Sequence, residues 1–73
     1  MVDRISVVGL GKLGAVLAAV LADKGFDVTG VDRDPTVVDA IRHGKAPVEE
    51  TGLAELIARS RARLRATQRI ATA

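Results

Sequence analysis

The sequence contains no cysteine, tryptophan or tyrosine, and it has one phenylalanine and one histidine. Without cysteine, the chain has neither a disulfide framework nor a thiolate metal site. The single histidine, His43, has no second imidazole to share a metal and no nucleophile or carboxylate placed beside it for a triad. We therefore expect no catalytic residue and no metal site in these 73 residues, and we interpret His43 as a solvated residue near a helix end.

Long hydrophobic runs are also missing. The longest charge-free stretch, residues 13–22, is shorter than the roughly 20 residues that a membrane-spanning helix needs. The N-terminus shows no basic region followed by a long apolar core, which is the pattern of a secretory signal peptide. We expect a cytoplasmic protein without membrane contact, and a chain of this length forms at most one small domain of marginal stability.

The net charge of +2 conceals an uneven distribution of basic residues. Residues 59–73 carry five arginines and no acid, which is a pattern that favours anionic partners such as nucleic acid. Recognition of single-stranded bases also uses aromatic stacking, however, and Phe26 lies far from the arginines in sequence. We expect no nucleic-acid partner, and a small non-enzymatic binding module that uses this basic segment is the alternative.

Three short, apolar, β-branched segments alternate with helical patterns. Strands are expected at residues 4–9, 26–31 and 63–67, and the first of them is typical of a strand buried on both faces of a parallel sheet. The resulting order β-α-β-α-α-β, with short connections, predicts an α/β fold whose parallel sheet has about three strands and right-handed crossovers.

The three predicted helices have recognisable ends. The first begins at Lys12, and its larger apolar residues recur along one helical face, at Leu13, Val16, Leu17, Val20 and Leu21. Asp34 and Pro35 are typical of the N-cap and first residue of a second helix. Glycines follow the predicted ends of these two helices, at Gly25 and Gly44. Thr51 is predicted to cap a third helix.

A G-x-G-x-x-G motif joins the first strand to the first helix. Its first glycine allows the tight turn, its second lets a pyrophosphate approach the backbone, and its third lets the helix pack closely on the sheet. The first N–H groups of the helix then point at the anion. A P-loop is excluded because Lys12 is followed by leucine rather than serine or threonine. The predicted phosphate-binding turn comprises Gly9, Leu10, Gly11, Lys12, Leu13 and Gly14.

An acidic residue ends the second strand, as a dinucleotide site requires. Asp32 lies 18 residues after Gly14, where its carboxylate can accept hydrogen bonds from the ribose hydroxyls and repel a 2′-phosphate. Arg33 complicates the choice, since an arginine here can accommodate a 2′-phosphate. A helix-capping role for Asp32 beside Asp34 is the alternative. Together with the glycines, Asp32 predicts a Rossmann-like fold with NAD as the cofactor.

The segment ISVVGLGKLGAVLAAVLADKGFDVTGVDRDPTVVDAIRHGKAPVEETGLAELI resembles the N-terminus of the UDP-glucose/GDP-mannose dehydrogenases. The most specific parts are VVGLGKLG, GVDRDP and APVEETGLAEL. In the last of these, Thr51 replaces the second proline of the family pattern Pro-x-x-Glu-Pro-Gly-Leu. Val37 stands where the family often has a basic residue near the cofactor.

The resemblance implies an NAD-dependent enzyme that oxidises the C6 alcohol of a nucleotide sugar to a carboxylate in two hydride transfers. It assigns the glycine turn to the pyrophosphate and Asp32 to the ribose. It also implies that the catalytic cysteine and the sugar-binding segments lie farther along the parent chain. Residues 1–73 would then be a partial dinucleotide-binding domain, the first part of a doubly wound NAD-binding domain, with the catalytic and sugar-binding domains absent. Another Rossmann dehydrogenase, of the 3-hydroxyacid or 6-phosphogluconate type, is the alternative within this class.

The first predicted strand also suggests a partner. With the strand order 3-2-1 expected for this fold, strand one is an open edge whose apolar residues are not interrupted by lysine or proline. An edge of that kind favours pairing with another chain. The expected partners are therefore the dinucleotide, a nucleotide sugar in the full-length parent, and a second copy of the chain.

Overall fold

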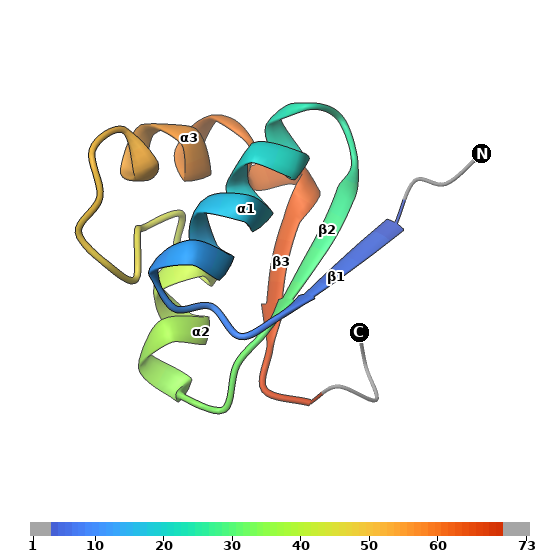
Figure 1. The fold of residues 1–73 in the computed structure, drawn as a ribbon. Coiled ribbons are helices and arrows are strands. Elements are labelled where there is room, and N and C mark those ends of the chain that lie inside the picture. The colour runs from blue at the N-terminus through green and yellow to red at the C-terminus, as the bar shows by residue number, and fades with distance from the viewer. Residues whose placement is uncertain (1–3, 70–73) are drawn as a thin grey trace.

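The computed structural model describes residues 4–69, which form one parallel sheet with helices (Figure 1). The strands are β1 (Arg4–Val8), β2 (Asp27–Val31) and β3 (Leu64–Thr67). The helices are α1 (Lys12–Asp23), α2 (Pro35–Arg42) and α3 (Leu53–Arg59), and a 3₁₀ turn (Arg61–Arg63) precedes β3. The predicted order of strands and helices is confirmed, and the strand bounds differ from the predicted ones by a residue.

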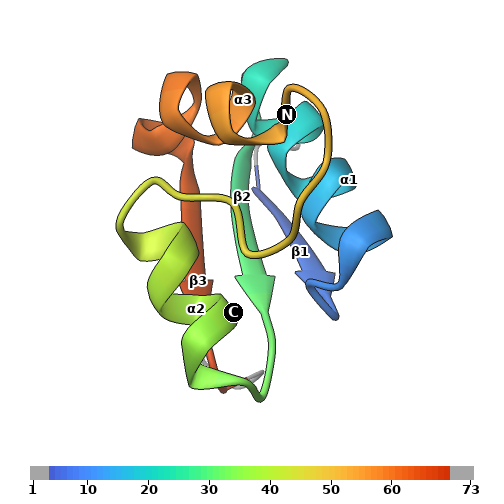
Figure 2. The ribbon, with the colours of Figure 1, turned by 90° about the vertical axis from the view of Figure 1, so that its left-hand side faces the viewer.

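The three strands are parallel and lie in the order β1-β2-β3, so β2 is central and β1 is an edge. Ile5 of β1 pairs with Val28, and Val28 pairs in turn with Leu64 of β3. All three helices lie on the same side of the sheet, as both views show (Figures 1 and 2). This placement follows from right-handed crossovers that run in one direction from β1 to β3.

The hydrophobic core fills the space between the sheet and the helices. Alternate strand residues point into it. Its largest fully buried side chains are Leu10, Ile41, Ile57, Val28 and Val38. On the other face of β1, Val8 is 64% exposed. The expectation that the first strand is buried on both faces is therefore wrong, because no helix of residues 4–69 covers that second face.

Helix α1 packs through its small residues rather than its large ones. Its buried side chains are all alanines, at positions 15, 18, 19 and 22. Leu13 is 84% exposed and Leu17 is 49% exposed, so the predicted apolar face does not form the main packing surface. The reason is the close approach of α1 to the sheet, where a methyl group fills the available space and a leucine would overfill it.

The helix ends test three sequence predictions. Asp34 caps α2 by accepting a hydrogen bond from the backbone N–H of Thr36 at 2.9 Å, which confirms the predicted Asp-Pro start. The predicted glycines after α1 and α2 both have positive φ angles, at Gly25 and Gly44. The predicted cap of α3 is wrong: Gly52, with φ of +80°, occupies the N-cap instead of Thr51. A left-handed turn enters α3, and glycine adopts that conformation without a steric cost.

The arginines around β3 hydrogen-bond to backbone carbonyls of distant segments. Arg42 donates from Nε to the carbonyl of Ala66 at 3.0 Å. Arg61 donates to the carbonyl of Arg42 at the end of α2, at 3.2 Å, and Arg63 donates to the carbonyl of Gly25 after α1, at 3.0 Å. The last carbonyls of a helix have no partner within it, so the guanidinium group of Arg61 satisfies an acceptor at the end of α2 that would otherwise need water.

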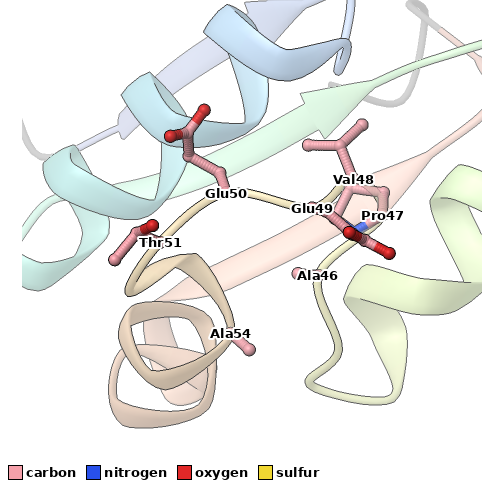
Figure 3. A pocket seen from close by; sticks show the side chains of 7 residues that line it. All are labelled: Ala46, Pro47, Val48, Glu49, Glu50, Thr51 and Ala54. Carbon is pink, nitrogen blue, oxygen red and sulfur yellow. The ribbon is translucent and has the colours of Figure 1, made fainter.

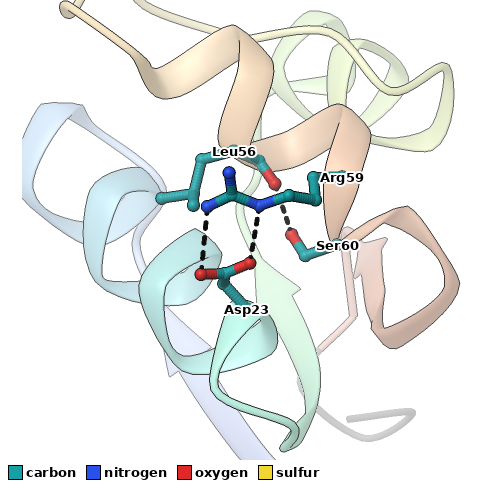
Figure 4. A network of polar contacts seen from close by, with 4 residues as sticks. All are labelled: Asp23, Leu56, Arg59 and Ser60. Atoms are coloured by element: carbon teal, nitrogen blue, oxygen red, sulfur yellow. Dashed lines mark hydrogen bonds and ion pairs between the residues drawn. The ribbon is translucent and has the colours of Figure 1, made fainter.

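An ion pair joins the C-terminal ends of α1 and α3 (Figure 4). Arg59 donates to both carboxylate oxygens of Asp23, at 2.9 and 3.1 Å. These hydrogen bonds lower the pKa of Asp23 and raise the pKa of Arg59. Beside the pair, the hydroxyl of Ser60 donates to the carbonyl of Leu56 at 2.7 Å and closes the last turn of α3.

Candidate functional site

The carboxyl ends of the three parallel strands meet at one edge of the sheet, and a hollow of about 430 Å³ lies there. Segments that follow each of the three strands line it, and its residues are Val8, Gly9, Val31, Asp32, Arg33 and Gln68. In open parallel sheets, ligands bind in the crevice outside the carboxyl ends of the strands. The structure therefore brings the predicted glycine turn and the predicted ribose acid to the same place.

A backbone hydrogen bond and a buried side chain hold the turn after β1 in place. Gly9 has φ of +92°, and its N–H donates to the carbonyl of Val31 at 2.7 Å, which extends the pairing of β1 with β2. The next side chain, Leu10, is completely buried. A Cβ on Gly30 would lie 2.7 Å from Leu10 Cδ1, so the glycine in β2 makes room for this leucine. Leu10 thus anchors the turn in the core.

The other two glycines differ in their surroundings. A Cβ on Gly14 would lie 1.8 Å from the carbonyl oxygen of Gly9, so only glycine allows α1 to approach the turn this closely. A Cβ on Gly11 would have no protein atom within 4 Å. Gly11 is also the N-cap of α1, and it offers no side chain to the first N–H groups of the helix. Open space and uncapped N–H groups therefore occur together at Gly11.

The Asp32 carboxylate ties the end of β2 to the glycine turn. One of its oxygens accepts the N–H of Asp34 at 2.9 Å, and the other accepts the N–H of Leu10 at 2.8 Å. These two bonds, the one from Asp34 being the larger cause, lower the pKa of Asp32. Each carboxylate oxygen has a further acceptor position, so hydroxyl groups of a ligand can still bind. The cap of α2 is Asp34, not Asp32.

Two residues that follow β2 and β3 form one side of the hollow. The side-chain amide of Gln68 donates to the carbonyl of Arg33 at 3.0 Å, and the N–H of Asp32 donates to the carbonyl of Thr67 at 3.1 Å. Gln68 is not among the residues predicted from the sequence. Its position directly after the third predicted strand was the available signal, because the carboxyl ends of parallel strands share an edge.

Lys12 and Leu13 begin α1 and lie at the surface. The ammonium group of Lys12 is 3.2 Å from the carboxylate of Glu50, which comes from the loop between α2 and α3. In Figure 3, Glu50 points toward α1 while Glu49 points away from it, beside an open hollow of about 700 Å³. The two adjacent acids differ in direction, although both line that hollow. The ion pair of Lys12 was not predicted from the sequence.

His43 lies apart from this site, and no cluster of metal ligands is found among the described residues. The ring of His43 lies 2.8 Å from the carbonyl of Asp39 at the exposed end of α2. Within residues 4–69, no three His, Asp or Glu side chains gather to hold a metal ion. The helices of the same residues are too short or too polar to cross a membrane. The glycine turn and Asp32 offer groups that can bind a phosphorylated ligand.

The comparisons with known proteins agree with this geometry. Residues 3–73 match the NAD binding domain of the UDP-glucose/GDP-mannose dehydrogenase family. GDP-mannose 6-dehydrogenase of Pseudomonas savastanoi pv. phaseolicola is 47% identical over 72 residues, which cover 96% of this chain and 16% of that protein. The chain therefore spans about a sixth of the length of such relatives.

Two solved structures have the same fold. A ternary complex of GDP-mannose dehydrogenase from Pseudomonas aeruginosa superposes with a TM-score of 0.85 at 41% identity, over 90% of this chain and 15% of that one. A UDP-glucose dehydrogenase from the archaeon Pyrobaculum islandicum superposes with a TM-score of 0.86 at 34% identity, over 94% of this chain and 16% of that one. Three parallel strands with helices on one side are thus the shared core of these matches.

Proposed function

The chain belongs to the UDP-glucose/GDP-mannose dehydrogenase family, whose NAD-binding domain it matches over residues 3–73, and we propose that it serves a nucleotide-sugar 6-dehydrogenase by holding the adenosine and pyrophosphate of NAD. The observation that carries this proposal is the bond between the glycine turn and the ribose acid, Leu10 N–H to Asp32 at 2.8 Å. That bond fixes the phosphate-binding backbone and the ribose-binding carboxylate relative to each other.

Each residue of the turn has its own part in the proposal. The pyrophosphate approaches Gly11, where a Cβ would meet open space. It accepts hydrogen bonds from the backbone N–H groups of Lys12 and Leu13 in the first turn of α1. Gly9 and Gly14 shape the turn. Leu10 contributes by its buried side chain and by its link to Asp32, because its N–H is already donated to that carboxylate.

The ribose hydroxyls bind Asp32 through the acceptor positions that its two backbone bonds leave over. A second negative charge at this point is unfavourable, which supports NAD over NADP. Arg33 is exposed beside it and moderates that preference. When bound, NAD accepts the hydride of the oxidation, and the chain's own residues only bind and orient it.

The substrate of the whole enzyme is proposed from the relatives, which are named for GDP-mannose and UDP-glucose. We propose that the catalytic and sugar-binding residues lie outside residues 1–73 and that this segment is a partial dinucleotide-binding domain. The absence of cysteine from the sequence supports that division.

The basic segment, residues 59–73, does not favour a separate binding module, since Arg61 and Arg63 are bonded to carbonyls of the fold. The cytoplasmic location stays a prediction.

Titration calorimetry of the chain with NAD and NADP tests the cofactor site. We expect weak NAD binding, a still weaker NADP affinity, and a loss of roughly tenfold or more in NAD affinity for Gly11→Ala, because a methyl group would stand where the pyrophosphate approaches. Asp32→Asn should narrow the difference between NAD and NADP, whereas Asp27→Asn, at the opposite end of β2, should preserve it. Equal NAD affinity of the Gly11→Ala and unmutated chains would contradict the phosphate position.

Self-association is the second part of the proposal. β1 is an edge strand with unpaired backbone groups, and Val8 at its end is largely exposed. Sedimentation should show dimers or larger species of the unmutated chain. Ser6→Lys places a charge in the middle of β1 and should dissociate them, whereas Leu17→Gln on the exposed side of α1 should not. Dissociation by Leu17→Gln alone would assign the interface to α1 and contradict edge pairing.

A further inference from the structure

We propose that Gln68 is a further binding residue of the dinucleotide site, contacting the adenosine end of the ligand beside Asp32. This inference rests on the proposed function and extends it to a residue that neither the glycine motif nor the ribose acid includes. Gln68 directly follows β3, and it lines the hollow at the carboxyl ends of the strands together with Asp32 and Arg33.

The position of the Gln68 side chain is fixed by a contact across the sheet edge. Its Nε2 donates to the carbonyl of Arg33 at 3.0 Å, although the two residues are 35 positions apart in sequence. The neighbouring backbone bond from Asp32 N–H to Thr67 holds the same two segments at 3.1 Å. The end of β3 therefore holds the segment that presents Asp32, and the amide is oriented before a ligand arrives.

The unused groups of this amide match an adenosine. A glutamine amide has two N–H donors and a carbonyl oxygen with two acceptor positions, and the bond to Arg33 uses one donor. A donor and an acceptor therefore remain at the rim of the hollow. A nucleoside offers both kinds of partner, through its ribose hydroxyls and through the edge of its base. A neutral amide adds no charge, so it keeps the preference against a 2′-phosphate that Asp32 creates.

Two valines give part of the hollow an apolar surface that suits a flat ring. Val8 and Val31 are paired in register at the ends of β1 and β2, and both line the hollow. Val8 is 64% exposed, so it offers apolar surface to a ligand. Apolar walls with a few placed polar groups are typical of small-molecule sites. Asp32 and Gln68 supply those polar groups from two neighbouring strands.

Fragments of the cofactor separate this role from a structural one. We expect Gln68→Ala to weaken 5′-AMP and NAD by roughly three- to tenfold, which is the usual effect of one lost hydrogen bond. Inorganic pyrophosphate, the other fragment, should bind the variant and the unmutated chain equally, and the melting temperature without ligand should stay the same because the bond to Arg33 is exposed. Gln68→Glu should bind 5′-AMP more weakly still, since a carboxylate would face the Arg33 carbonyl. Glu55→Gln on α3, far from the hollow, is the control.

The outcomes distinguish this inference from the proposed function. Equal 5′-AMP affinity of the Gln68→Ala and unmutated chains would overturn the role of Gln68 and leave the NAD site as proposed. A variant that loses melting temperature and affinity for both fragments together would show that Gln68 is structural only. If the unmutated chain binds neither 5′-AMP nor NAD, the proposed function fails and this inference fails with it.

Discussion

Gly14→Ala provides the sharpest test of how the glycine turn is built. The added Cβ would lie 1.8 Å from the carbonyl oxygen of Gly9 and 3.0 Å from its carbon. A Cβ contact below 3.0 Å is essentially never seen, so the two backbone segments must separate by about 1.2 Å or more. Neither partner is a flexible side chain, because one is the end of a strand and the other is the first turn of α1.

The expected cost follows from two opposing effects. Overpacking of this kind destabilises by roughly 1–3 kcal/mol, and a contact between two backbone segments belongs at the upper end of that range. Replacing glycine with alanine in a helix returns at most about 1 kcal/mol. The net loss is about 2 kcal/mol, which lowers the melting temperature of a chain this size by roughly 8–16 °C.

Thermal melts followed by circular dichroism measure this loss, and Gly11→Ala is the matched control. Its Cβ would have no protein atom within 4 Å, so only the weaker N-cap preference of alanine applies, about 1 kcal/mol or less. We expect Gly14→Ala to lose stability and Gly11→Ala to lose mainly the ligand. A Gly14→Ala chain that melts within about 3 °C of the unmutated one would refute the close approach of α1 to the turn.

Two further predictions concern the carboxylates. The pKa of Asp32 is lowered in the folded chain, so its contribution to stability is complete above the unfolded value near 3.8 and is lost as the pH falls through the lower folded value. Between pH 5 and pH 2.5, the melting temperature should therefore fall less steeply for Asp32→Asn than for Asp27→Asn. Parallel curves for the two variants would contradict this. The Asp23–Arg59 pair is exposed, so we expect it to contribute little to stability and to be screened by salt. The difference in stability between Asp23→Asn and the unmutated chain should shrink in 1 M NaCl. A constant difference would mean that the pair does not act through charge.

Local chemistry predicted much of the fold and of the site. The Asp34-Pro35 start of α2 could be read from the sequence because the cap and the fixed proline φ act within one turn. The spacing of Gly9, Gly11 and Gly14 likewise placed the turn between β1 and α1. These features depend on neighbours in sequence, so no knowledge of the tertiary structure was needed. The roles of the individual site residues remain predictions.

The wrong predictions for α1 and α3 and the omission of Gln68 depend on how segments lie in three dimensions, which the sequence alone does not give. The leucines of α1 carry more apolar surface than its alanines, yet the alanines are buried, because the contact of Gly14 with Gly9 brings the helix too close for larger side chains. Threonine is a favourable N-cap residue, but the chain enters α3 through a left-handed turn at Gly52, which occupies the N-cap instead of Thr51. Gln68 reaches the site only through pairing of β3 with β2, which unites residues 35 positions apart.

The arginine contacts around β3 have a consequence for the chain during its synthesis on the ribosome. Arg61 bonds the carbonyl of Arg42 at the end of α2, and Arg63 bonds the carbonyl of Gly25 in the turn after α1; both arginines are translated well after those helices. Leu64 and Ala66 of β3 complete the core at the same time. Until these residues have emerged, the nascent chain has its helical sequences but lacks these contacts with the end of α2 and with the turn after α1. Folding of the segment is therefore expected to be completed late, after translation of nearly all of it.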